Sequence, residues 1–190
     1  RVRAAVKYVL GDRRLLLALV AVTTVGIASD PSITLTPSVA DNLGGGAGLV
    51  GTLSAVFGLG AALGMAVLAL IRGRIPAAQV SSVGLWGLAA GCAVLAVGSA
   101  PAVALAGFGL AGLGFGWAMT GLSTVVQERA PEQLRGRIMA LWLVGFVGSR
   151  PIAAAVLGGA ADAFSVYTAF GVAAALCVAV ALLCRPSRLG

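Results

Sequence analysis

Six long apolar segments, separated by connectors of only a few residues, constrain what this chain can fold into more than any other feature. A helix needs about 20 mostly apolar residues to cross the roughly 30 Å hydrocarbon core of a membrane. The six segments cover 15–39, 48–71, 80–98, 102–126, 138–161 and 166–184. Backbone polar groups in lipid must be satisfied within each segment, and the alternation of a barrel strand is absent, so transmembrane helices are predicted.

The composition supports the same conclusion. The chain is 59% hydrophobic and only 10% charged, with a mean hydropathy of +1.04, whereas ordinary soluble domains are about a quarter charged. A soluble fold of this size keeps too much of its chain at the surface to hide so much apolar area. We therefore expect an all-α polytopic membrane protein with one domain over 15–184, flanked by the short segments 1–14 and 185–190.

The basic residues indicate how the chain is oriented. With six spans, both ends and the second and fourth connectors face one side of the membrane. That side carries twelve of the thirteen basic residues, whereas the opposite connectors carry only Asp41 and Asp162. The twelve are Arg1, Arg3, Lys7, Arg13, Arg14, Arg72, Arg74, Arg129, Arg135, Arg137, Arg185 and Arg188. The positive-inside rule then predicts that both termini are cytoplasmic, and the net charge of +7 suits an anionic membrane face rather than nucleic acid.

Two further patterns concern local packing. In 1–14, Val6 and Val9 share a helical face while Arg3 and Lys7 lie near the other, which is typical of a helix in the headgroup plane; an unstructured linker end is the alternative. Small residues one helical turn apart let transmembrane helices approach closely. Three such pairs occur, namely Gly60 with Gly64, Gly87 with Gly91, and Gly112 with Gly116.

The stretch from Gln127 to Ser165, "QERAPEQLRGRIMALWLVGFVGSRPIAAAVLGGAADAFS", resembles the cytoplasmic loop, eleventh helix and following loop of the major facilitator superfamily. It is most similar to the bacterial drug and siderophore exporter branch that includes the enterobactin exporters. The matching positions are Gln127, Pro131, Arg135, Gly136, Arg137, Met139, Gly148, Pro151, Gly159, Asp162 and Phe164. The resemblance implies helices seven to twelve of a twelve-helix transporter of the bacterial inner membrane, with Pro151, Gly159 and Asp162 in helix packing and the outer loop motif.

The resemblance also implies partners and a mechanism. Because the chain starts at Arg1 rather than Met, we expect a piece of a longer protein whose amino-terminal six-helix half is missing here. Substrate would bind near the midplane between the halves, giving a proton-coupled exporter of drugs or siderophores that works by alternating access and needs no cofactor or metal. The "RGRIPAAQ" connector departs from the family loop because it has no acid, and Arg150 stands before Pro151 where a small or apolar residue is expected.

Asp30 and Arg150 are the ionisable residues inside the spans, and charged groups at membrane depth are functional candidates. At 1.5 Å per residue they lie roughly 22 Å and 18 Å from the cytoplasmic edge, so they are predicted to be close enough to pair. The functional interpretation makes Asp30 a proton-coupling or cation-binding carboxylate controlled by Arg150. The alternatives are a structural ion pair, or an Asp30 that caps the helix before Pro31. Pro31 and Pro37 are expected to kink or end the first span.

Other polar residues are candidates for the walls of a central cavity. They are Thr23, Thr24, Trp117, Thr120, Ser123 and Thr124. The alternative is that the hydroxyls bond their own helix backbone and that Trp117 packs against lipid or a helix. Trp142, one turn from Arg137, is interpreted as an interface anchor.

The charged connector between the fourth and fifth apolar segments also has two interpretations. In the first its charges only fix the topology, and in the second they also close a cytoplasmic gate against the other half. The residues of this loop motif and gate are Gln127, Glu128, Pro131, Glu132, Arg135, Gly136 and Arg137.

Two rival functions were weighed against transport. A membrane protease needs an activated nucleophile, commonly a Ser with a His base, and this chain has no His. A metal-dependent lipid transferase needs clustered acids, and the six acids are dispersed. A nonfunctional transporter fragment remains the other alternative.

Overall fold

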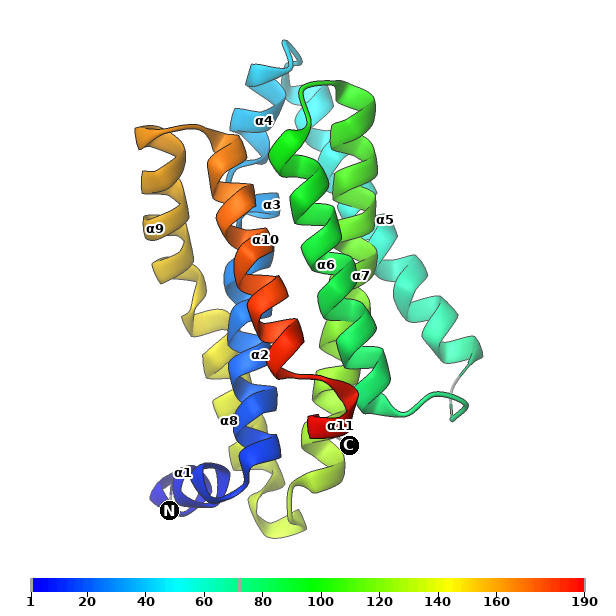
Figure 1. The fold of residues 1–190 in the computed structure, drawn as a ribbon, viewed down its shortest axis with the longest axis vertical. Coiled ribbons are helices and arrows are strands. Elements are labelled where there is room, and N and C mark those ends of the chain that lie inside the picture. Colours follow the sequence, from blue (N-terminus) through cyan, green and yellow to red (C-terminus); the bar gives the residue numbers. More distant parts are fainter. Residues whose placement is uncertain (1, 72, 190) are drawn as a thin grey trace.

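The computed structural model describes residues 2–71 and 73–189, and in this part of the chain it contains helices but no strand (Figure 1). Arg1 and Arg72, used above for the orientation, lie outside the described residues. Six helical segments of the described chain are long and apolar enough to cross a membrane, which confirms the all-helical polytopic prediction. The helices that build these spans are α2 (Arg13–Ser29) with α3 (Pro31–Thr34) and α4 (Thr36–Asn42), α5 (Ala47–Leu70), α6 (Ala77–Val97), α7 (Pro101–Arg129), α8 (Glu132–Gly148) with α9 (Arg150–Ala163), and α10 (Val166–Leu183).

Two spans are interrupted at prolines. In the first span, α2 stops before Asp30, and Pro31 and Pro37 lie in the first turns of α3 and α4, as predicted for a kinked span. The fifth span, expected over 138–161, covers Glu132–Ala163 and is interrupted as well, which the sequence-based prediction did not include. It divides at Ser149, because Pro151 in the first turn of α9 has no N–H and its ring crowds the preceding turn.

The charged connector is more helical than the sequence suggested. Helix α7 continues to Arg129 and α8 begins at Glu132, so only Ala130 and Pro131 form the turn. At the amino terminus, α1 (Val2–Gly11) is a helix, which favours the first of the two alternatives for this segment. Figure 1 shows α1 lying across the end of the bundle. The Asp12 side chain then caps α2 by accepting from the Arg14 and Leu15 amides at 2.9 and 3.2 Å.

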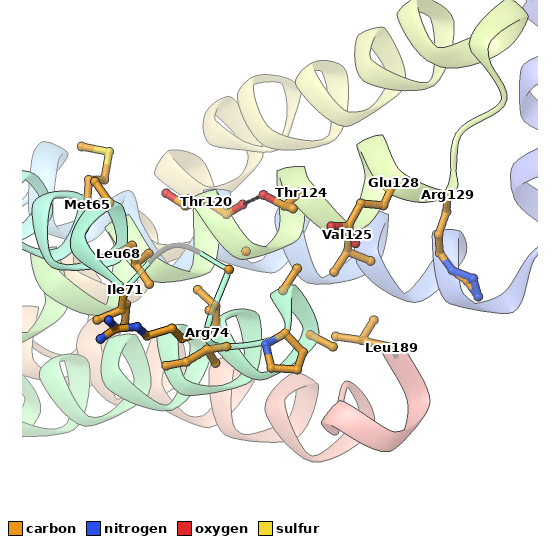
Figure 2. A pocket seen from close by; sticks show the side chains of 18 of the residues that line it. Met65, Leu68, Ile71, Arg74, Thr120, Thr124, Val125, Glu128, Arg129 and Leu189 are labelled. Carbon is orange, nitrogen blue, oxygen red and sulfur yellow. Dashed lines mark hydrogen bonds between the residues drawn. The ribbon is translucent and has the colours of Figure 1, made fainter.

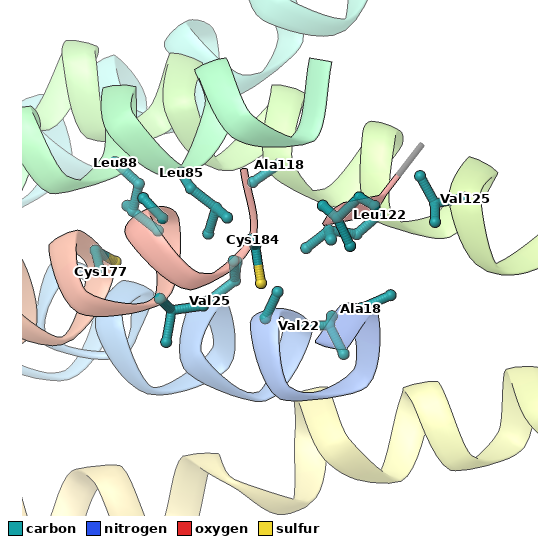
Figure 3. Close-up of a cluster of buried hydrophobic side chains, with 14 of the residues drawn as sticks. Ala18, Val22, Val25, Leu85, Leu88, Ala118, Leu122, Val125, Cys177 and Cys184 are labelled. Atoms are coloured by element: carbon teal, nitrogen blue, oxygen red, sulfur yellow. The ribbon is translucent and has the colours of Figure 1, made fainter. Parts of the chain in front are cut away.

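The spans pack around α2 and α7. Helices α5 and α6 lie on either side of α7, α8 and α10 contact α2, and α10 also packs on α6. Figure 3 shows the core where α2, α6, α7 and α10 meet, with Val22, Val25, Leu85, Leu88 and Leu122 directed into it. Cys177 and Cys184 are buried in the same cluster as free thiols. Helices α5, α7 and α8 form the side of the bundle on which the ring contacts described below lie.

Glycines allow the helices to approach closely. A Cβ on Gly84 or Gly91 of α6 would overlap the α7 backbone at Ala118 or Ala111. On the other side of α7, a Cβ on Gly112 would overlap the Phe57 carbonyl of α5. Each glycine of the three predicted pairs has atoms of a neighbouring helix where its Cβ would be, so the packing role is confirmed for Gly60, Gly64, Gly87, Gly91, Gly112 and Gly116.

We expect Gly112→Ala to destabilise the bundle, because the added methyl group collides with backbone that cannot move aside. Overpacking of this kind costs about 1–3 kcal/mol. Gly58→Ala on α5 is the matched control, because its Cβ would have no atom within 4 Å. Helicity followed during unfolding in mixed detergent micelles measures both variants, and equal stability of the two would contradict the close α5–α7 contact.

Candidate functional site

The two interrupted spans touch each other just below their breaks. Gly26 of α2 faces α8, where a Cβ would lie 2.5 Å from both the Phe146 carbonyl oxygen and the Ser149 Oγ. The Ser149 hydroxyl lies 2.9 Å from the Phe146 carbonyl and 3.4 Å from the Thr23 carbonyl. The breaks at Asp30 and Ser149 are therefore held at one level of the bundle.

Asp30 is buried at the first of these breaks, with 4% of its surface exposed. Its carboxylate accepts a hydrogen bond from the Thr34 hydroxyl at 3.0 Å, and its backbone carbonyl accepts from the Ile33 and Thr34 amides at 2.8 Å. The Asp30 side chain accepts no capping hydrogen bond from an amide of α3, whose first residue, Pro31, has no N–H. The carboxylate is therefore held at the break by Thr34.

Arg150 begins α9 at the second break. Its guanidinium carbon lies 5.1 Å from the centroid of the Phe146 ring, a cation–π contact. Its Nε is buried and has no hydrogen-bond partner among the described residues. Helix α9 contacts α2 and α3, but in the described part of the chain no ion pair joins Arg150 to Asp30. The predicted pairing is therefore not among the contacts of these two residues.

Sequence reasoning missed a chain of ring contacts that links α5, α7 and α8, which we call the aromatic row (Phe57, Phe115, Phe146 and Trp142). Neighbouring ring centroids are 5.7 Å apart for Phe57 and Phe115, 6.0 Å for Phe115 and Phe146, and 5.9 Å for Phe146 and Trp142. Trp142 Nε1 is buried and lacks a hydrogen-bond partner within the described residues. Trp142 thus belongs to the aromatic row, whereas its position one turn from Arg137 had indicated an interface anchor.

The predicted cavity hydroxyls bond their own helices. The Thr23 and Thr24 hydroxyls donate to the Leu19 and Val20 carbonyls at 2.9 and 3.1 Å. The same pattern holds on α7, where Thr120 donates to Gly116, and Ser123 and Thr124 donate to the Thr120 carbonyl, at 2.8 to 3.0 Å. A hydroxyl bonded in this way keeps a lone pair for a ligand but has already used its proton.

The same residues nevertheless line hollows in the bundle. Thr23 and Thr24 lie on a groove of about 430 Å³ between α1, α2 and α8. Thr120 and Thr124 line a cavity of about 1040 Å³ between the facing ends of α5, α6 and α7 (Figure 2). Trp117 lies against Gly64 of α5, and its Nε1 has no partner in the described chain.

The larger cavity opens at the end of the bundle that carries Arg14, Arg74 and Arg129, which we call the basic end. Apolar side chains of α5, including Met65 and Leu68, form one wall, and Glu128 and Arg129 lie at the end of the α7 wall (Figure 2). A cavity of this kind suits an amphipathic ligand that enters from the basic end. A metal site is a separate matter: none of the described residues form a group of three or more metal-ligating side chains.

The residues predicted to form the loop motif and gate lie in the turn between α7 and α8 and in the helical turns on either side of it. Gln127 and Glu128 lie in the last turn of α7, Pro131 precedes α8, and Glu132, Arg135, Gly136 and Arg137 are exposed along its start. Their exposure leaves them free to contact another protein segment, so the gate stays a prediction. The outer motif residues Pro151, Gly159 and Asp162 are exposed on α9, and a Cβ on Gly159 would meet no atom within 4 Å.

Comparison with known proteins agrees with this architecture. The family described as Major Facilitator Superfamily matches residues 14–188. A crystal structure of the peptide transporter POT in complex with sulfate gives a TM-score of 0.82 at 15% identity, covering 91% of this chain and 37% of that one. A mutant of that transporter in complex with alafosfalin gives 0.80 at 16% identity, covering 90% of this chain and 37% of the other. No curated protein matches at the level of sequence.

Each of the two intramembrane charges has its own partner in this structure, so their contributions to stability should be independent. We expect Asp30→Asn and Arg150→Gln to change the free energy of unfolding additively, within about 0.5 kcal/mol. A double-mutant cycle measured in mixed micelles tests this. A coupling well above that value would show that the two groups meet in the folded chain, against the contacts described here.

Proposed function

The chain belongs to the major facilitator superfamily, and from this premise we propose that it forms the carboxy-terminal six-helix half of a secondary active exporter. The exporter moves a drug-like or siderophore-like small molecule out of a bacterial cell, across the inner membrane, at the expense of a proton gradient. Its partners are the lipid bilayer, an amino-terminal six-helix half, the substrate and protons. Family and fold are those of a membrane transporter and not of an enzyme.

The length of the chain supports the two-half architecture. The chain covers little more than a third of the length of the peptide transporter structures that it resembles. About nine tenths of this chain is matched in the same comparisons. Six spans are half of the usual number in this fold, and substrate in such folds binds near the midplane between two halves. We infer that helices α2 to α10 correspond to helices seven to twelve.

The observation that carries the proposal is that the span breaks and the aromatic row lie at nearly the same depth along their spans. Phe115 is the middle residue of the 29-residue α7, and Phe146 lies at the middle of the 32-residue span formed by α8 and α9. The breaks at Asp30 and Ser149 lie close to this level. Interrupted helices and polar groups at mid-depth are tolerated where they face a water-filled cavity or a protein partner, and not where they face lipid.

Asp30 is the residue that we assign to proton coupling. It is a buried carboxylate at a helix break, where it accepts a hydrogen bond from Thr34. A buried acid inside a membrane span is costly, so its presence there favours a functional role. With both termini in the cytoplasm, protons reach Asp30 from the outer end of the bundle when the basic end is closed.

Transport should require both halves, because this chain supplies only part of the cavity wall. We expect inside-out vesicles that contain this chain together with its amino-terminal half to accumulate a fluorescent drug when their lumen is acidified. Vesicles that contain the 190 residues alone should accumulate none. Asp30→Asn in the two-half protein should abolish the acid-driven accumulation but leave exchange of substrate without a gradient intact.

The outcomes separate the alternatives. Uptake by the 190 residues alone would contradict the half-transporter assignment. A folded two-half protein that moves neither drugs nor siderophores with a proton gradient would contradict the exporter assignment and favour a nonfunctional fragment. Asp30→Asn with unchanged acid-driven uptake would remove this residue from the coupling role.

A further inference from the structure

The aromatic row and Arg150 occupy one level of the membrane. The Phe115 and Phe146 rings are at the middle of their spans, and Phe57 is the eleventh residue of the 24-residue α5. Trp142 lies one helical turn from Phe146 toward the basic end, and Arg150 lies one turn from Phe146 in the opposite direction. Three spans therefore place aromatic side chains, and one of them a cation, where a transported ligand would rest.

Arg150 at this level has no anionic partner among the described residues. The guanidinium contacts the Phe146 ring, and its buried Nε has no acceptor in the described chain. The carboxylate of Asp30, which lies inside the first span, is bonded to Thr34 instead. An unpaired arginine inside a membrane is costly, and a guanidinium binds carboxylates and related anions in a planar, two-pronged geometry. The site therefore has an unfilled requirement for negative charge.

The rings beside Arg150 define what else the ligand should contain. All four side chains of the aromatic row are half-buried, so each keeps part of its surface open. Phenyl and indole rings attract further rings in offset or edge-to-face arrangements. The Trp142 Nε1 is a second buried donor for which the described residues offer no acceptor. An aromatic ring with an anionic substituent would satisfy the rings and the cation together.

We propose that the aromatic row and Arg150 form a binding subsite for an aromatic ring that bears a negative charge. The ring lies against Phe115 and Phe146, and its anionic group replaces water at the Arg150 guanidinium. The opposite wall of the subsite comes from the amino-terminal half. This inference rests on the proposed function, because it names the substrate class of that exporter, but it is a statement about binding and is tested without a proton gradient.

Binding of three matched probes to the two-half protein in phosphatidylcholine nanodiscs tests the proposal. The probes are 2-naphthoate, 2-naphthylmethylammonium with the same ring and opposite charge, and cyclohexanecarboxylate with the charge but no aromatic ring. We expect 2-naphthoate to bind at least about tenfold more tightly than either other probe, since hydrogen bonds to charged groups are stronger than those between neutral groups. Titration calorimetry gives the affinities, and quenching of tryptophan fluorescence reports proximity to Trp142.

Variants then assign the preference to the two parts of the subsite. Arg150→Gln should lower the affinity for 2-naphthoate to that for the cationic probe, and Phe146→Leu should lower it to that for cyclohexanecarboxylate. Arg150→Lys, which keeps the charge, should retain most of the anion preference. Trp86→Phe on the exposed side of α6 and Arg188→Gln on α11 (Pro186–Leu189) are the matched controls and should bind as the unaltered protein does.

Equal affinity of the unaltered protein for the three probes would overturn the proposal, and this comparison does not depend on any variant folding. Unchanged 2-naphthoate affinity in a folded Arg150→Gln protein would overturn it as well. Proton-driven efflux of a cationic drug without 2-naphthoate binding would leave the exporter function standing and reject the subsite. Selective 2-naphthoate binding without any proton-driven transport would do the reverse.

Discussion

The helices of this chain depend on one constraint, which is that a backbone N–H or carbonyl in lipid must find its partner inside the protein. Prolines break that rule at Pro31, Pro37 and Pro151 because they supply no N–H. Side-chain hydroxyls supply donors next to two of these prolines. The Thr36 hydroxyl donates to the Ser32 carbonyl and the Ser149 hydroxyl to the Phe146 carbonyl, both at 2.9 Å. At Pro31 the Asp30 carbonyl accepts from the Ile33 and Thr34 amides instead. These bonds satisfy carbonyls at the points where the spans are interrupted.

Close helix packing provides the second part of the architecture. Glycines bring α5 and α6 against α7, and Gly26 brings α2 against the end of α8. Helix α8, by contrast, makes little direct contact with α7. The Phe115 and Phe146 rings reach across this gap, so the aromatic row forms where the backbones separate. The rings and the Arg150 guanidinium consequently gather on the side of the bundle made by α5, α7 and α8.

The sequence was sufficient for the fold but only partly for the site. Apolar length and charge distribution predicted six helical spans, and Pro31 and Pro37 predicted the interruption of the first. Pro151 was equally visible, yet its break was missed because the resemblance treated it as part of a packing motif.

Asp30 and Arg150 are buried and half-buried, as their places inside apolar spans predicted. Depth along a helix does not fix the direction of a side chain, however, and each has a different local partner. Phe57, Phe115 and Phe146 were overlooked because a phenylalanine in an apolar span has no distinguishing local pattern.

We propose that the side of the bundle made by α5, α7 and α8 lines a water-filled pathway, whereas the exposed face of α6 that carries Val83 contacts lipid. Leu143, next to Trp142 on α8, and Val83 on α6 have nearly equal exposure, 53% and 52%, and the three native cysteines are buried. Reaction of a charged, membrane-impermeant thiol reagent with Leu143→Cys and Val83→Cys, each in the two-half protein in lipid, compares the two sides directly. The account predicts that Leu143→Cys reacts and that Val83→Cys does not. Equal reaction at both positions, or reaction only at Val83→Cys, would contradict it.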